Sequence, residues 1–196
     1  MFTNHIPNHI LRVAACSAIA LILGAASAGA EPVKNPEYEN WAKFKTGAMS
    51  KVEVVSAAAG NETKQTIVTK LLEMSPEKAV VEMNISMDMM GTKMDMPAQK
   101  REIKAMIDNT TTPTPKPDAG TKLPEVKTSQ ETVKVGDKEI KCTVAEATSE
   151  QNGMKTVSKT WTSPEVPGQM VKTEMKSTGT MDSTVNMKLV EFSVGN

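Results

Sequence analysis

Residues 79–89 alternate between apolar and polar side chains, and this alternation constrains the fold more than any other feature of the sequence. Successive side chains of a β-strand point to opposite faces of the sheet, so the alternation predicts a strand with one buried face. Val80 is the exception on the polar side. The apolar side consists of Ala79, Val81, Met83, Ile85, Met87 and Met89.

The same alternation recurs through much of the chain that follows. It is found in 51–54, 133–144, 171–176 and 181–189. Asn152-Gly153 is a typical hairpin turn. We therefore predict an all-β fold in which eight to ten antiparallel strands form a meander with short turns. A sheet of this size tends to curl, which predicts a half-barrel-like shape. The segment 99–107 fits either a strand or a helix.

Two further patterns concern the long hairpins. Consecutive apolar residues break the alternation within 63–74, which predicts a β-bulge there. A weak echo also links two parts of the chain, because Trp41 followed by 70–73 resembles Trp161 followed by 188–191. Both parts have the order tryptophan, turn, strand, glycine turn and long strand. An internal repeat and a coincidence between two hairpins of similar length both account for this echo.

One short N-terminal helix is expected over 36–45. Asn35 suits the N-cap position, Pro36 the first helical position, and Glu37 the positive end of the helix dipole. Aromatic residues follow at roughly helical spacing, so the helix is expected to dock on the sheet.

The first 30 residues are predicted to be a cleavable signal peptide. Arg12 precedes an apolar run, and Ala28-Gly29-Ala30 fits the small-residue cleavage pattern. The alternative is a membrane anchor, but the apolar run is shorter than the ~20 residues that a spanning helix needs. Cys16 lies in a lipobox-like context, yet it precedes the apolar run instead of following it, which favours an ordinary cysteine. The sequence thus predicts export to the periplasm or the medium, with no transmembrane segment after cleavage.

The remaining residues, 31–196, are predicted to form a single β domain. The exception to its strand pattern is 108–123, a Thr- and Pro-rich stretch that we interpret as a surface loop. The full chain has 23 basic and 23 acidic residues, so its charge gives no indication of a nucleic acid partner. A protein partner cannot be named from the sequence.

The residues for most catalytic sites are missing from 31–196. Both histidines, His5 and His9, belong to the predicted signal peptide, which removes Ser-His-Asp triads and zinc sites of the histidine type. Cys142 lies between Ile140 and Val144 on an apolar strand face, where a buried inert thiol is expected. We predict that the protein is not an enzyme, and we assign no metal site and no cofactor.

Methionine is unusually frequent, with six residues in 83–96. Three interpretations remain open: a closed core, a soft lining for an apolar ligand, and a thioether site for Cu(I). The leading hypothesis is that an apolar small molecule, a lipid or a lipidated partner binds to this face. The alternatives are a structural or interaction protein of the cell envelope that acts through its surface and the 108–123 loop, and methionine-based copper binding. The candidate lining residues are Met83, Ile85, Met87, Met89, Met94, Met96, Met175, Met181 and Met187.

Several segments together resemble a family of uncharacterised exported bacterial proteins. They are 35–38, 41–45, 71–73, 161–168 and 189–192. The resemblance implies a capped helix and turns, and it implies no active-site residues. The predicted plan is also similar to that of the bacterial lipoprotein-localisation carriers, half-barrels that hold acyl chains on a concave apolar face. The sequence departs from that plan because no set of helices is predicted to plug such a half-barrel.

Overall fold

The computed structural model describes residues 32–89, 92–107, 125–151, 153–179 and 182–196. These residues belong to one compact unit, Glu31–Asn196. The predicted signal peptide and the predicted loop at 108–123 lie outside the described residues.

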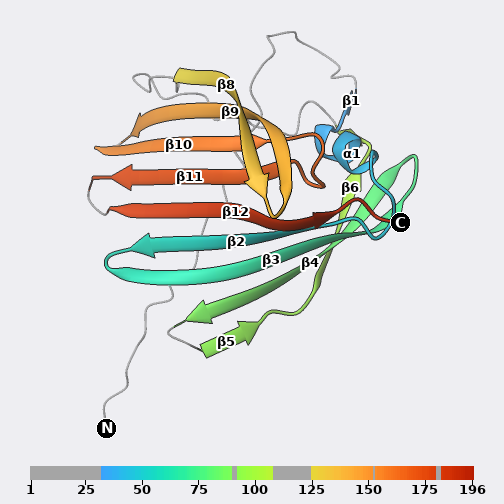
Figure 1. The fold of residues 1–196 in the computed structure, drawn as a ribbon, viewed down its shortest axis with the longest axis horizontal. Coiled ribbons are helices and arrows are strands. Elements are labelled where there is room, and N and C mark those ends of the chain that lie inside the picture. Colours follow the sequence, from blue (N-terminus) through green and yellow to red (C-terminus); the bar gives the residue numbers. More distant parts are fainter. Residues whose placement is uncertain (1–31, 90–91, 108–124, 152, 180–181) are drawn as a thin grey trace. The chain divides into compact units, whose positions relative to one another are not determined.

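The described chain is nearly all antiparallel β-sheet, as the alternating pattern predicts, with one short helix (Figure 1). The helix is α1 (Pro36–Trp41), and the strands of the first half are β1 (Val33–Lys34), β2 (Met49–Ala58), β3 (Asn61–Met74), β4 (Lys78–Met89), β5 (Thr92–Asp95), β6 (Gln99–Lys104) and β7 (Met106–Ile107). Those of the second half are β8 (Glu125–Val135), β9 (Lys138–Gln151), β10 (Met154–Thr162), β11 (Met170–Thr178) and β12 (Ser183–Ser193). The segment 99–107, which the sequence left ambiguous, is extended.

The main sheet has ten strands in the order β5-β4-β3-β2-β12-β11-β10-β9-β8, with β6 beside β4. It consists of two meanders, β2 to β6 and β8 to β12, which the antiparallel pairing of β12 with β2 joins into one sheet. A simple meander would leave β2 and β12 apart, so the sequence did not indicate this pairing. A separate pair of short strands joins β1 to β7.

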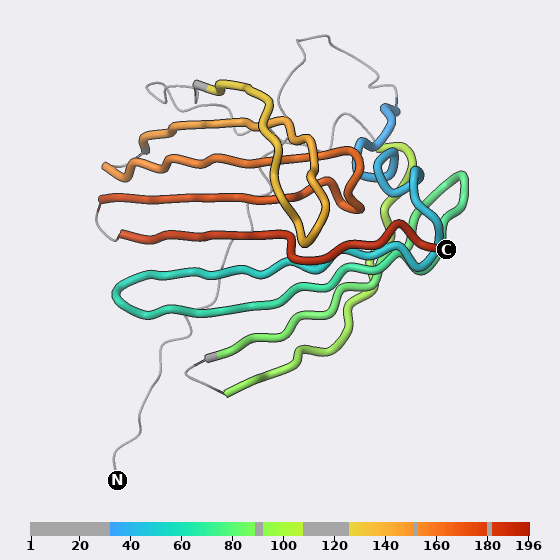
Figure 2. Tube along the Cα trace, in the orientation of Figure 1, coloured from blue at the N-terminus to red at the C-terminus, as the bar shows by residue number. Residues whose placement is uncertain are grey.

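The hairpin of β8 and β9 departs from the direction of the other strands. Part-way along its length it bends, and its closed end crosses in front of β10 and β11 in the view of Figure 2. The end of β8 contacts β12, although three strands separate the two in the sheet order. The sheet therefore curls over at this end without closing.

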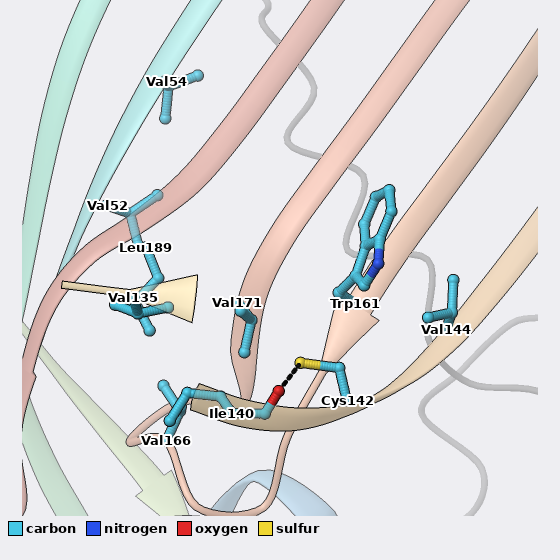
Figure 3. Packing of buried hydrophobic residues seen from close by; sticks show 10 residues of the cluster. All are labelled: Val52, Val54, Val135, Ile140, Cys142, Val144, Trp161, Val166, Val171 and Leu189. Carbon is cyan, nitrogen blue, oxygen red and sulfur yellow. Dashed lines mark hydrogen bonds between the residues drawn. The ribbon is translucent and has the colours of Figure 1, made fainter. Parts of the chain in front are cut away.

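Two clusters of buried apolar residues hold the fold together. The larger one contains Val52, Val54, Val135, Ile140, Cys142, Val144, Trp161, Val166, Val171 and Leu189 (Figure 3). The smaller one lies by the helix and contains Trp41, Ala48, Leu71, Ala79, Val81 and Ile103. The bent hairpin thus contributes Val135, Ile140, Cys142 and Val144 to the same core as the pair of β2 and β12.

The helix begins where the sequence predicts and ends earlier. The side chain of Asn35 accepts a hydrogen bond from the Glu37 amide at 3.0 Å, as an N-cap does. After Trp41 the backbone continues in tighter i to i+3 turns, in which the amides of Lys43 and Phe44 donate to the carbonyls of Asn40 and Trp41. The helix therefore spans Pro36–Trp41 and not 36–45. Within the described ranges, no helix combines the length and the apolar character that crossing a membrane requires.

Candidate functional site

The strand register brings most of the predicted methionine lining onto one face of the sheet. Met94 lies opposite Met87, Met87 opposite Gln65, and Met187 opposite both Val54 and Thr173. Because directly paired residues of antiparallel strands point to the same face, these side chains form one continuous line across five strands. We call this line, Met94–Met87–Gln65–Val54–Met187, the methionine row.

The candidate residues around this row differ in exposure. Those that are half-buried are Met83, Ile85, Met87, Met175 and Met187. Met94 and Met96, at the β5 edge, keep 50% and 41% of their surface exposed. Met187 packs against the larger core together with Ile67 and Val185. The side chain of Met89 and the whole of Met181 lie outside the described residues. The described methionines of this face thus range from half-buried to exposed, and Val54 between them is buried in the larger core.

A groove of about 530 Å³ opens elsewhere, among β8 to β12. Two rows of cross-strand partners supply nearly all of its lining. The first row is Lys127–Glu146–Lys159–Glu174–Asn186. The second row is Thr148–Val157–Lys176–Thr184. Ser158 and Met175 complete the lining.

The groove and the methionine row lie on opposite faces of the sheet. Glu174 and Lys176 flank Met175 on β11, and side chains alternate between the faces along a strand. Met175 shares its face with the methionine row, because Val185, its partner on β12, lies two residues from Met187. The two rows that line the groove therefore project from the other face, whereas Met175 and its partner Ser158 border the groove from strand positions that point to the methionine side.

Trp161 lies one step further along the groove face and is surrounded by charged groups. Its indole nitrogen donates a hydrogen bond to Glu131 at 2.8 Å, and the ammonium groups of Lys159 and Lys172 lie 4.9 and 4.5 Å from its ring centroid. Lys159 also forms ion pairs with Glu131 at 2.9 Å and with Glu146 at 3.0 Å. This cluster ties β8, β9 and β10 together at the inner end of the groove.

The titration behaviour of this cluster follows from its hydrogen bonds. Hydrogen bonds donated by Lys159 and Trp161 hold the pKa of the Glu131 carboxyl below its ordinary value. The carboxylates of Glu131 and Glu146 raise the pKa of Lys159. Both shifts favour the charged forms, so these groups are ionised at neutral pH and neither is poised for proton transfer.

The remaining reactive group is the Cys142 thiol. It is completely buried in the larger core, and this burial raises its pKa, which disfavours the nucleophilic thiolate. No histidine lies in the described part of the chain to act as a base. Among the described residues, no three His, Cys, Asp or Glu side chains gather in a way that could hold a metal ion.

Sequence reasoning missed both the groove and the cluster around Trp161. The alternation of charges was visible within single strands, for instance Lys172 and Glu174. What assembles the site is the order β8-β9-β10-β11-β12 and its register, which align Glu146, Lys159 and Glu174 across three strands. Glu146 and Lys159 lie at equal distances in sequence before and after the predicted turn Asn152-Gly153, so a search for opposite charges at such positions could have found their pairing.

The comparisons with known proteins identify no relative of established function. No family model matches the chain, and no curated protein matches it. One solved structure from Bacteroides fragilis, a protein whose export is inferred and whose fold is described as YmcC-like, aligns over 76% of this chain and 97% of its own. The identity is 13% and the TM-score is 0.42, and we draw no conclusion from a likeness of this size. The comparisons lend no support to a relationship with the lipoprotein-localisation carriers in particular.

Proposed function

We propose that this protein is exported and acts without catalysis, by binding an apolar ligand on the face that carries the methionine row. The ligand class is an acyl chain, either free or attached to a lipidated partner. The observation that supports this proposal is the methionine row, in which Gln65 is the one polar member, across strands that belong to both meanders. Export is supported by the sequence pattern of residues 1–30.

The chemistry of the face suits such a ligand. Methionine side chains are unbranched and polarisable, so they adapt to chains of different shape. Met83, Met87 and Met187 are half-buried, which leaves apolar surface that a ligand can cover, and Met94 and Met96 extend that surface to the sheet edge. Covering apolar surface stabilises a complex by roughly 25 cal/mol per Å² before the costs of association are subtracted.

The test uses the chain from Glu31 to Asn196 with a neutral probe, monododecanoylglycerol, measured by titration calorimetry. Met87→Lys places a charge within the methionine row, and we expect it to weaken binding at least about tenfold, a loss of ~1.4 kcal/mol. Met106→Lys is the matched control. Met106 is likewise a strand methionine, more exposed than Met87, but it lies on β7, outside the main sheet, and its replacement should leave the affinity unchanged.

Native mass spectrometry of the protein purified from its own secretory compartment provides an independent test. A co-purifying lipid that is lost from Met87→Lys would support the proposal. Equal affinity of the wild type and Met87→Lys for the probe, or no binding by the wild type, would refute it and would favour a role in protein interaction.

A further inference from the structure

The groove of β8 to β12 has a balance of charge that points to a ligand of its own. Its two acidic lining residues are already paired: Glu146 with Lys159 at 3.0 Å, and Glu174 with Lys172 at 2.6 Å. Lys159 is shared further with Glu131. The carboxylates of the groove are therefore neutralised within the protein.

Lys176 differs from the other basic residues of the groove. It lies in the second row of the lining, and none of the ion pairs or hydrogen bonds between described residues involves it. Lys127 has an interaction of its own, so it is not counted as free. The charge that the groove offers to a ligand is consequently positive and is located at Lys176.

The surroundings of Lys176 are apolar on one side and hydroxylic on the other. Val157, its direct partner on β10, keeps 43% of its surface exposed. The methylene stem of Lys159 follows on the same face of β10, because the two residues are two positions apart. Thr184, the partner of Lys176 on β12, adds a hydroxyl group. An ammonium group beside exposed apolar surface complements a molecule that joins an acidic group to an apolar chain.

We propose that this groove binds a small anionic amphiphile, with its acidic head at Lys176 and its apolar chain against Val157 and the stem of Lys159. The groove's volume of about 530 Å³ lies within the ~300–1,000 Å³ typical of small-molecule sites. The proposal concerns the face opposite to the methionine row, so it stands independently of the function proposed above. The shared chemistry is a carboxylate or phosphate monoester on a single acyl chain.

The experiment is titration calorimetry of residues 31–196 carrying Met87→Lys, which weakens acyl-chain binding at the methionine row, with monomeric dodecanoate, dodecyl phosphate, dodecanol and acetate. We expect the two anionic amphiphiles to bind, dodecanol to bind at least about tenfold more weakly, and acetate not to bind, because a charge-assisted contact and an apolar contact are both required. Dodecanol binding as tightly as dodecanoate, or acetate competing at equal concentration, would overturn the proposal.

Further substitutions, each added to Met87→Lys, locate the site. Lys176→Met keeps the aliphatic stem but removes the charge, and it should weaken dodecanoate binding about tenfold while leaving dodecanol binding unchanged. Lys70→Met is the control, because Lys70 is also an exposed strand lysine but lies on β3, outside the groove. Val157→Asp introduces a negative charge beside Lys176 and should abolish dodecanoate binding. An unchanged dodecanoate affinity in Lys176→Met would overturn the proposal.

Two further arms distinguish the groove from the methionine row and from a membrane surface. Dodecanoate should still bind to Met87→Lys in a way that depends on Lys176. Binding found only in the wild type would place the acid at the methionine row and overturn the groove assignment. Vesicles of phosphatidylglycerol test the alternative source of acidic lipid. Co-sedimentation with these vesicles that depends on Lys176 would show that the groove binds a membrane surface and not a single amphiphile, which would overturn the proposal. The thermal midpoint of each variant, followed by circular dichroism, confirms that it is folded.

Discussion

Asn40 connects two parts of the chain that lie more than a hundred residues apart. Its side-chain oxygen accepts a hydrogen bond from the Gly168 amide at 2.8 Å, and its side-chain nitrogen donates one to the Val166 carbonyl at 3.3 Å. Asn40 is buried, so Asn40→Ala would leave two backbone groups without partners. We expect a loss of about 2–4 kcal/mol in the free energy of unfolding, measured by denaturant titration.

The matched control for this prediction is Asn84→Ala. Asn84 is exposed on β4, and its replacement should change the free energy of unfolding by less than about 0.5 kcal/mol. Equal effects of the two substitutions would show that the docking of the helix against 163–169 does not depend on Asn40.

Glu131 gives a prediction about pH. Because the pKa of its carboxyl is lower in the folded protein than in the unfolded chain, its ionised form stabilises the fold. This contribution is present above the unfolded pKa and is lost as the pH falls through the lower folded pKa. Glu131→Gln removes it, so the thermal midpoint of the wild type should exceed that of the variant at pH 7, and the gap should narrow below about pH 4.

Glu150→Gln serves as the control for the acid range, since Glu150 is an exposed residue near the end of β9. Its thermal midpoint should follow that of the wild type at every pH. A gap between wild type and Glu131→Gln that stays constant from pH 7 to pH 3 would contradict the assignment of the shift to the ionised carboxylate.

At the scale of the elements, the sequence predicted the strands better than it predicted their neighbours. Local alternation is enough to place β4 or β11, because the faces of a strand differ in polarity. The bulge expected within 63–74 is confirmed, as the register shifts between Leu71 and Glu73. The helix was overestimated, because the aromatic spacing cannot distinguish α-helical turns from the tighter turns that follow Trp41.

The echo between the two long hairpins acquires a physical counterpart in the structure. The register of β12 with β2 shifts between Leu189 and Glu191, just as that of β3 with β4 shifts between Leu71 and Glu73. In both places a fully buried leucine precedes the extra residue. A bulge bends its strand and increases the local twist, so the same four-residue pattern produces curvature in both meanders.

At the scale of the whole molecule, the pairing of strands distant in sequence determines the features that the sequence alone did not predict. The methionines were expected to share a face, and the register places Met87, Met94 and Met187 on one. The groove was not expected, because its lining is aligned by the register of five strands, β8 to β12. Such features depend on contacts between residues distant in sequence, which periodicity within one strand does not encode.

Cys142 allows the stability of the whole molecule to be measured. It is fully buried in the larger core, its thiol faces the Ile140 carbonyl at 3.5 Å, and burial raises its pKa (Figure 3). It is the single cysteine in residues 31–196, so no disulfide within this part of the chain can contribute to stability and the packing must supply it. We expect the native protein to react with a thiol reagent such as dithionitrobenzoate at least about a thousandfold more slowly than the unfolded chain.

The dependence of this labelling rate on reagent concentration tells which motion exposes the thiol. A labelling rate that is the same at low and moderate reagent concentrations would show that opening of the fold limits the reaction. Because the thiol forms no disulfide within this part of the chain, added reductant should leave the thermal midpoint unchanged. Rapid labelling of the native protein would contradict the expectation. It would mean that the β8–β9 hairpin, which carries Cys142, detaches from β12 while the rest of the sheet stays folded, so that this hairpin is held less firmly than the other strands.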